Sequence, residues 1–235
     1  NGASVSSGTS MATPHVAGLA ALLYAATDYT PYEVKNTIMN TATHDVLAAN
    51  GAVHGPNRVG SGRVDVLDAV NSKVMAYDSE DQTLTSVNFG VLEVGADALS
   101  VTRKVTVQNK SDRPRTFDVS YLPASTMPGV EITTAPSVSV GANAKATVDV
   151  TLTIADPTAL AKTIDPAADV EQLGLQRQYL ADVSGRVQLA SAGIPTLRVP
   201  VYSAPKPTSD MTAGTEISFA DSEALAADVT LTGRD

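Results

Sequence analysis

The sequence of 235 residues contains no cysteine and no tryptophan, and only 4% of its residues are aromatic. The absence of cysteine excludes a disulfide-stapled scaffold and any zinc site built on thiolates. The scarcity of large rings means that alanine, valine, threonine and leucine must fill most of a core. Because 43% of the residues are apolar, the chain can still build a sizeable core, in one large domain or two small ones.

Long apolar runs and an excess of positive charge are also missing. No run approaches the roughly 18 apolar residues that a membrane span needs, and no basic-then-apolar leader is visible, so we expect no signal peptide in this chain. Acidic residues outnumber basic ones by 25 to 16, which gives a net charge of −9. Without a basic stripe, nucleic acid and anionic membranes are poor partners. We therefore expect neither a membrane span nor a nucleic-acid partner.

Residues 1–76 have the pattern of a helical block. From 16 to 24 almost every residue is apolar, which predicts a helix that is buried on nearly every side. Thr30, Pro31 and Glu33 then form the pattern of a capping box with proline in the first turn, which predicts the start of a second helix.

The end of this block is expected to be a loop followed by a short helix. Asparagine and glycine are frequent between residues 43 and 62, which favours a loop. The segment 64–71 predicts a third helix, with Val66, Leu67 and Val70 facing inward.

From about residue 77 to residue 203 the pattern becomes that of strands. Apolar and polar residues alternate in many short segments separated by turn residues, which predicts an antiparallel β-sandwich. The alternating segments are 87–95, 101–109, 117–121, 138–140, 146–154, 185–189 and 197–201. Residues 155–178 are less regular and are expected to form a long insertion between strands. Pro200 inside a strand indicates a sheet edge or a bulge.

Residues 204–235 form a third segment. Residues 204–209 have the composition of a linker, and 216–220 and 228–232 are predicted to be single strands. Two strands cannot bury a core alone. They are therefore expected either to extend the sandwich or to belong to a further or truncated β domain.

One segment can carry chemistry, namely GTSMATPHVAG from Gly8 to Gly18. A glycine-containing turn that leads directly into a helix places Ser10 at the helix N-terminus, where unpaired N–H groups and the helix dipole favour negative charge. Ser10 could then be a nucleophile whose own N–H helps to hold an oxyanion. The structural alternative is that Ser10 is an ordinary helix N-cap.

This string resembles the nucleophile segment of the subtilisin-like serine proteases, the subtilase or peptidase S8 family. Residues 30–41 and 60–70 are similar to the helices that follow it in the family, so the resemblance covers about residues 1–71. It implies that Ser10 is the acylating nucleophile and a backbone oxyanion donor. It also implies that Thr9 supports the turn and that Met11 is sensitive to oxidation.

The resemblance also implies what the chain does not carry. The family supplies the catalytic Asp and His and the oxyanion Asn from positions upstream of residue 1, so the chain alone is expected to be inactive. His15 lies five positions from Ser10, well round the same helix, and is expected to be a packing residue rather than the base. His44 and His54 match no base motif and are expected to be exposed loop residues. Three isolated histidines make no zinc site.

The strands from residue 87 onward resemble the immunoglobulin-like or fibronectin-III-like accessory domains that follow many subtilase catalytic domains. No residue in them demands chemistry. The acidic pairs Glu80/Asp81 and Asp165/Asp169 are interpreted as solvated surface rather than calcium ligands. No cofactor or metal is expected in this chain, and any calcium is expected in the upstream portion.

The sequence thus predicts a mixed fold in three parts. Residues 1–76 are the helical C-terminal portion of an α/β subtilisin-like catalytic domain, 77–203 are an all-β fibronectin-III/immunoglobulin-like sandwich, and 204–235 are a linker with further strands. The predicted function is that of a secreted serine endopeptidase acting through Ser10, with a protein or peptide as substrate and the missing N-terminal catalytic portion as partner. Two alternatives remain open at this point: a β-sandwich adhesion or binding module, and a pseudoenzyme with a subtilase remnant.

Overall fold

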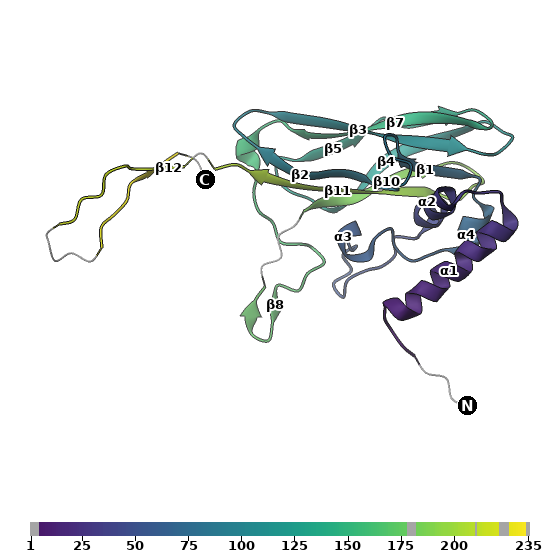
Figure 1. Cartoon of the computed structure of the whole chain (residues 1–235), viewed down its shortest axis with the longest axis horizontal. Helices are drawn as coiled ribbons and strands as arrows, with labels where there is room; N and C mark the ends of the chain where they lie inside the picture. Colours follow the sequence, from purple (N-terminus) through teal and green to yellow (C-terminus); the bar gives the residue numbers. More distant parts are fainter. Residues whose placement is uncertain (1–4, 178–181, 210, 221–225, 234–235) are drawn as a thin grey trace.

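The computed structural model of the chain describes residues 5–177, 182–209, 211–220 and 226–233. The first residues of the predicted helical block and parts of the predicted third segment therefore lie outside the described residues. The molecule is a two-layer β-sandwich with a helical cover on one side and a thin two-stranded arm at one end (Figure 1).

The two sheets of the sandwich contain four and five strands. The first has the order β1-β3-β7-β5 and the second the order β2-β11-β10-β4-β6. Their bounds are β1 Val74–Asp78, β2 Val87–Val94, β3 Leu99–Asn109, β4 Arg115–Ser125, β5 Glu131–Thr134, β6 Ser137–Val140, β7 Ala144–Ile154, β10 Val183–Ala190 and β11 Leu197–Pro207. All predicted strands between residues 87 and 201 are present, and β1 and β5 are additional. The sandwich architecture is therefore confirmed.

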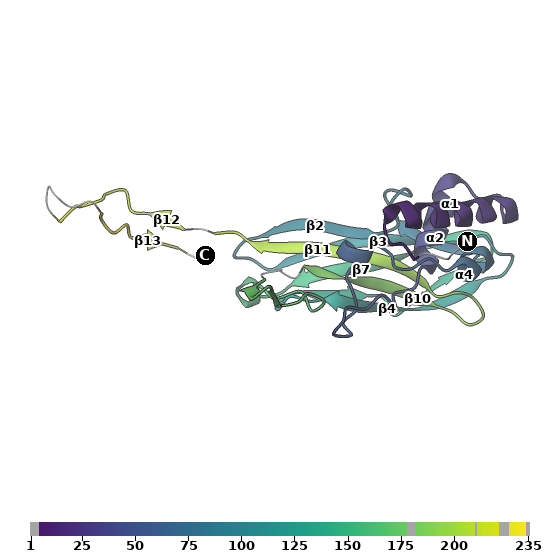
Figure 2. The ribbon, with the colours of Figure 1, turned by 90° about the horizontal axis from the view of Figure 1, so that it is seen from below.

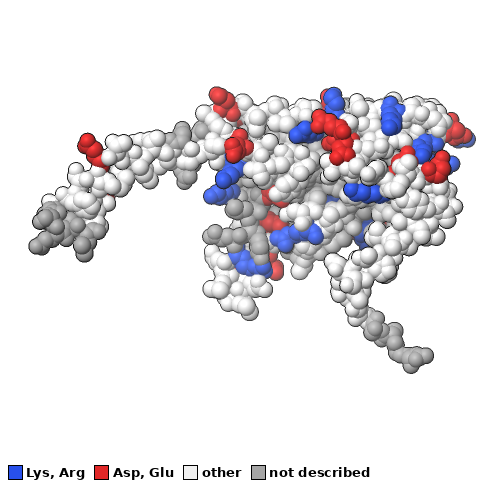
Figure 3. Space-filling view, viewed as in Figure 1, with Lys and Arg blue, Asp and Glu red and all other residues white. Residues whose placement is uncertain are grey.

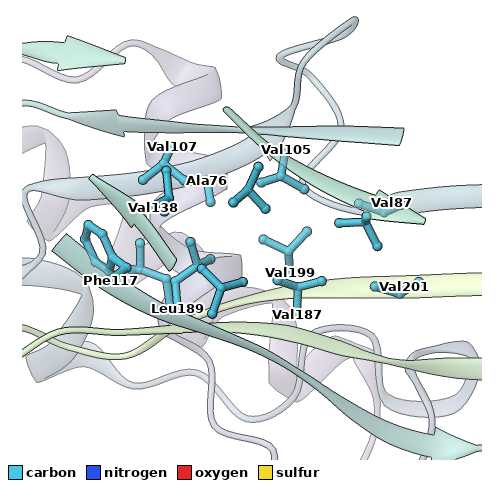
Figure 4. Packing of buried hydrophobic residues seen from close by; sticks show 14 of the residues in the cluster. Ala76, Val87, Val105, Val107, Phe117, Val138, Val187, Leu189, Val199 and Val201 are labelled. Atoms are coloured by element: carbon cyan, nitrogen blue, oxygen red, sulfur yellow. The ribbon is translucent and has the colours of Figure 1, made fainter. Parts of the chain in front are cut away.

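Aliphatic side chains from both sheets fill the space between them. Val105 and Val107 of β3 face Val187 and Leu189 of β10 across the core, with Phe117 beside them, and all five are fully buried (Figure 4). Because side chains alternate between the two faces of a strand, the polar residues between these positions lie on the outer faces. Small aliphatic residues thus replace the missing aromatics, as the composition predicts.

The sandwich is not wholly antiparallel, because β11 pairs with β2 in parallel. Pro200 lies in β11, which is an inner strand between β10 and β2. The prediction that Pro200 marks an edge strand is therefore wrong. Pairing of β11 with β2 begins only at Val201, directly after the proline, and the register shifts between Tyr202 and Ser203. The missing N–H of Pro200 therefore costs no ladder bond to β2.

The helical cover consists of four helices, α1 Thr9–Ala26, α2 Pro31–Thr41, α3 Pro56–Val59 and α4 Val66–Asn71. It lies against β1 and against the outer face of β11 and β10, as the view from below shows (Figure 2). α2 begins with the predicted capping box, in which Thr30 and Glu33 bond each other's backbone N–H groups.

Two expectations about these helices are wrong for the described chain. α1 is exposed over most of its length, and within it Leu19 and Leu23 are the buried residues. An all-apolar helix needs cover on every side, and the described residues supply it on one side only. In α4 Val66 and Leu67 are exposed, whereas Ala69 is the buried residue.

The irregular segment before β10 is an excursion from the sandwich, as predicted. It holds the 3-10 turn η1 Pro157–Ala159 and the short hairpin of β8 Glu171–Gln172 and β9 Leu175–Gln176. Asp165 is not a solvated residue, because its carboxylate is buried and forms an ion pair with Arg58 at 2.8 Å. This contact ties the segment to α3.

Residues 204–207 of the third segment belong to β11 and pair with β2, so the prediction of a linker at 204–209 is wrong for these four residues. The described residues beyond them form the thin arm that projects from the sandwich (Figure 1). β12 Thr212–Ala213 pairs with β13 Leu231–Thr232. The predicted strand at 216–220 is absent from the described residues, and that at 228–232 is reduced to β13. The arm pairs with itself through these two strands.

Candidate functional site

Ser10 is the second residue of α1 and not its N-cap. The N-cap is Gly8, with φ 147° and ψ 166° and no side-chain capping bond. The structural alternative, in which Ser10 simply caps the helix, is therefore wrong. The Gly8 carbonyl accepts the N–H groups of Met11 at 3.0 Å and Ala12 at 3.1 Å. Among the described residues, the backbone N–H of Ser10 has no hydrogen-bond acceptor, as expected for the first turn of a helix.

The surroundings of Ser10 are open to solvent. Ser10 and its neighbours on the first turn are exposed, and within the described part of the chain the Ser10 hydroxyl forms no hydrogen bond. The Thr9 carbonyl accepts the Thr13 hydroxyl at 2.8 Å, which stabilises the first turn. Met11 is 43% exposed and contacts the Ser6 hydroxyl through its sulfur at 3.7 Å. The site therefore presents a hydroxyl and a free N–H on one helix end, with an accessible thioether beside them.

The three histidines do not serve Ser10 as a base. Nδ1 of His15 lies 2.7 Å from the Met11 carbonyl one turn back, so the ring is held against its own helix. His15 is exposed in the described chain, where the sequence predicts a packing residue. His44 and His54 are half-buried rather than exposed, and the Nδ1 atoms of both are buried without a hydrogen-bond partner. Within the described ranges, no three histidine or acidic side chains converge as a metal site would require.

The far end of α1 is fixed by an apolar cluster beside the sandwich. Leu19 and Leu23 pack with residues of α2, α4, β1 and the loop before α2, namely Tyr29, Val34, Ile38, Ala69, Met75 and Tyr77. The Tyr29 hydroxyl donates to the Ser72 carbonyl at 3.0 Å. The C-terminal half of the helix that carries Ser10 is thus held by the start of the β domain.

Glu33 links this helical block to the sandwich by charge. Its carboxylate accepts the Thr30 N–H at 2.8 Å, the Gln108 amide at 3.0 Å and the Lys110 ammonium at 3.1 Å. Burial alone would raise the pKa of this carboxyl, but the bonds from Thr30 and Lys110 outweigh burial and lower it.

Lys110 also lies 4.6 Å from the ring centre of Tyr29. Burial, followed by the nearby Glu33 carboxylate and Asp28, raises the pKa of Tyr29 to about 12.

A row of buried amides on α2 completes this link. Asn40 accepts the Ala76 N–H at 2.7 Å and donates to the Arg198 carbonyl at 3.0 Å. One turn earlier, Asn36 accepts the Thr85 hydroxyl at 2.6 Å. Sequence reasoning missed both asparagines, although their spacing of four residues places them on one helix face.

Much of α1 remains uncovered and apolar. Val16, Leu22 and Tyr24 are 41%, 52% and 49% exposed. The helix contains no charged residue, and the surface at its position is white in the space-filling view (Figure 3). These side chains lie on different sides of the helix, because positions 22 and 24 of an α-helix are about 160° apart. Exposed apolar surface of this extent is typical of an interaction surface. Among the described residues, no helix is long and apolar enough to cross a membrane.

Comparison with known proteins supports the resemblance seen in the nucleophile segment. Residues 1–65 match the subtilase family. The chain is 30% identical over 138 residues to a subtilisin-like protease of Arabidopsis thaliana, covering 54% of this chain and 18% of that protein. It is 45% identical over 71 residues to another from the same plant, covering 29% of this chain and 9% of that protein.

A bacterial relative gives a similar picture. The chain is 35% identical over 118 residues to the C5a peptidase of Streptococcus pyogenes, covering 46% of this chain and 10% of that protein. The chain thus spans less than a fifth of the length of these relatives. Alignments of 118 and 138 residues are longer than the matched family segment and therefore extend into the strands. Residues 1–65 of this chain thus match the subtilase family, and a mostly β domain follows them.

Proposed function

We propose that this chain is the C-terminal portion of a secreted subtilisin-like serine endopeptidase that hydrolyses peptide bonds through an acyl-enzyme on Ser10. The observation that carries the proposal is the start of α1. Gly8 caps the helix, and Ser10 presents both its hydroxyl and an unpaired backbone N–H within a subtilase segment.

The proposed chemistry assigns two atoms of Ser10 to one reaction. The hydroxyl oxygen attacks the carbonyl carbon of the scissile peptide, and its proton passes to a general base. The backbone N–H donates to the oxyanion that develops on the carbonyl oxygen. Collapse of the intermediate expels the amine, and water then hydrolyses the acyl-enzyme. Thr9 contributes by keeping the first turn in shape through its bond from Thr13.

The base and the other oxyanion donor are proposed to come from outside the chain. His15 is turned toward its own helix, and the half-buried histidines belong to the loop 43–62, against the sandwich. The proposed partner is therefore an upstream catalytic portion that supplies the Asp, His and Asn of the family. The exposed apolar face of α1 is the surface that such a portion would cover. The chain alone would be inactive, and a protein or peptide would be the substrate of the whole.

The contacts of α2 support a proposed role for each part of the chain. The catalytic domain would end before β1, because β1 crosses the predicted boundary at residue 76 and pairs with β3 in the sandwich. A fibronectin-III-like domain would follow and end with β11 at Pro207, and the residues after it would lead into further strands. The bonds of Glu33 and Asn40 to the sandwich favour a stabilising role for that domain.

Labelling with a fluorophosphonate probe tests this proposal. The probe is applied to the 235-residue chain and to a version extended upstream by a subtilase catalytic portion. Each is compared with Ser10→Ala and with Ser7→Ala, a control at an exposed neighbouring serine. We expect labelling of the extended protein and of its Ser7→Ala variant, and none of Ser10→Ala. A folded extended protein that stays unlabelled would overturn the proposal in favour of a pseudoenzyme or a binding module.

A further inference from the structure

Two arginines lie on the outer face of the five-stranded sheet, under the loop 43–63, and the proposed function does not use them. Val187 and Val199 belong to the core of the sandwich. Because successive side chains of a strand point to opposite faces, Arg186 of β10 and Arg198 of β11 point toward the helical cover, where they contact the carbonyls of His54 and Ala42. Arg186 is only 2% exposed.

Arg186 is a buried cation whose charge is not matched. Its two terminal nitrogens donate to the His54 carbonyl at 3.4 and 3.5 Å, and one of them donates to the Gly60 carbonyl at 3.4 Å. These distances are at the long end for hydrogen bonds, and the acceptors are neutral. The Nε atom is buried with no partner. Among the described residues no carboxylate forms an ion pair with Arg186, although a buried guanidinium keeps its charge and is unfavourable alone.

The second arginine adds to the positive charge. Arg198 donates to the Ala42 carbonyl at 3.3 Å, and its Nε atom is also buried without a partner. Asp68 and Asp45 lie near enough to favour its charged form, although burial has the larger and opposite effect on its pKa. Burial, and then the charge of Arg198, lowers the pKa of Arg186. The two guanidinium groups therefore repel each other across this interface.

Further polar atoms without partners lie in the loop that covers the pair. The Nδ1 atoms of His44 and His54 and the hydroxyl of Ser61 are all buried and unpartnered. The charges of both arginines reach His44, because after burial they are the causes that lower its pKa. His54 and the residue before Ser61 provide the carbonyls that Arg186 contacts. Buried polar groups are normally hydrogen-bonded, so this concentration of free donors indicates an occupant.

Solvent reaches the edge of this cluster through a groove. The groove has a volume of about 420 Å³, and Gly60, Ser61 and Pro200 form part of its wall. Gly60 is bonded to Arg186, and Pro200 is its partner in the ladder between β10 and β11. The groove thus reaches residues that contact Arg186, although neither arginine lines it.

We propose that a small inorganic anion binds between Arg186 and Arg198 beneath the loop 43–63. Chloride and phosphate both fit this description. The anion would accept N–H bonds from the two guanidinium groups and further bonds from the Ser61 hydroxyl and an imidazole N–H. It would neutralise the unpaired charge of Arg186, and it would fasten the end of the subtilase segment to the sandwich.

Thermal unfolding of the 235-residue chain in different salts tests this site. Wild type is compared in sodium chloride, sodium phosphate and sodium gluconate at equal ionic strength, since gluconate is too bulky for a buried site. A ligand that binds only the folded state raises the unfolding midpoint with its concentration. We expect the midpoint to rise by about 3 °C or more in chloride or phosphate relative to gluconate. The increment should vanish in Arg186→Met and persist in Arg103→Met, a control at an arginine on the other sheet.

Two results would overturn the proposal. The first is an equal midpoint of wild type in all three salts, which would leave water as the occupant. The second is an equal increment in Arg186→Met, which would be a general salt effect. If Arg186→Met does not fold, the line width of the chloride-35 signal decides the matter with folded wild type alone. Broadening that phosphate reverses supports the site, and the absence of broadening contradicts it.

Discussion

The Glu33 carboxylate and the Lys110 ammonium are 3.1 Å apart, and this ion pair joins the first turn of α2 to the end of β3. The Glu33 side chain is 7% exposed and that of Lys110 is 25% exposed. Because the same carboxylate completes the capping box of α2, one side chain both starts a helix and docks it on the sandwich. The integrity of the subtilase segment therefore depends on a residue of the β domain.

Replacing Lys110 with methionine should destabilise the chain. The substitution leaves the carboxylate of Glu33 buried with fewer donors, and breaking a largely buried pair is costly. We expect a loss of about 2 kcal/mol in the free energy of unfolding, measured by urea denaturation. Lys104→Met is the matched control. Lys104 pairs with Asp149 on the exposed face of the sheet, and its loss should cost less than about 1 kcal/mol. Equal effects of the two substitutions would contradict this account.

The contribution of Glu33 should depend on pH. Its folded-state pKa is lower than the ordinary value of 4.5, so the ionised form is the one that folding favours. Its stabilising contribution is therefore complete above the unfolded pKa and is lost as the pH falls through the folded pKa. The difference in unfolding free energy between wild type and Glu33→Gln should be constant near neutral pH and shrink below about pH 4.5. A difference that grows toward low pH would refute this assignment.

Asn40→Ala should separate α2 from the sandwich. The substitution removes the acceptor for the Ala76 N–H and the donor to the Arg198 carbonyl, and both backbone groups would be left unsatisfied. We expect a loss of about 2–3 kcal/mol by urea denaturation. Asn71→Ala, at an exposed residue of α4, serves as control and should change stability by less than about 0.5 kcal/mol.

Gly185→Ala should disturb the sandwich at one close approach. A Cβ atom at this position would collide with the Leu122 carbonyl oxygen and would lie 2.7 Å from the Tyr121 hydroxyl. Overpacking of this kind costs about 2–3 kcal/mol, which chemical denaturation would detect. Gly95→Ala is the control, because a Cβ there meets no heavy atom within 4 Å. A stable Gly185→Ala variant would show that β4 and β10 can move apart.

Leu22→Gln should distinguish the chain alone from the extended protease. Leu22 is 52% exposed on α1, so in the 235-residue chain the substitution should change stability by less than about 0.5 kcal/mol. In the extended protein the same face would be covered, and a buried glutamine should reduce fluorophosphonate labelling and thermal stability. Val91→Thr, at an exposed residue of β2, should leave both proteins unchanged. Indifference of the extended protein to Leu22→Gln would contradict the covering of α1.

The sequence predicts those strands of the sandwich in which one side faces the core and the other faces water. Alternation identifies β2, β4 and β7 for this reason. The alternation pattern does not predict β1. Its residues Val74, Met75, Ala76 and Tyr77 are all buried, because the strand lies between the core and the helices. A strand that is covered on both faces has no alternation.

The polar interface was not predictable from the sequence. Asparagines in a helix and arginines at alternate strand positions normally indicate solvent, yet Asn36, Asn40 and Arg186 are buried. These three side chains are buried because the helical cover packs on the sheet. The reverse holds for α1, where an apolar sequence predicts burial, yet in the described structure Leu19 and Leu23 are its buried residues.

The polar docking of α2 has a mechanical consequence. Its bonds run from Glu33 and Asn40 to Gln108 of β3, Ala76 of β1 and Arg198 of β11, so we expect the sandwich to stay fixed relative to the anchored end of α1. The sandwich and the C-terminal half of α1 are therefore expected to move as one body.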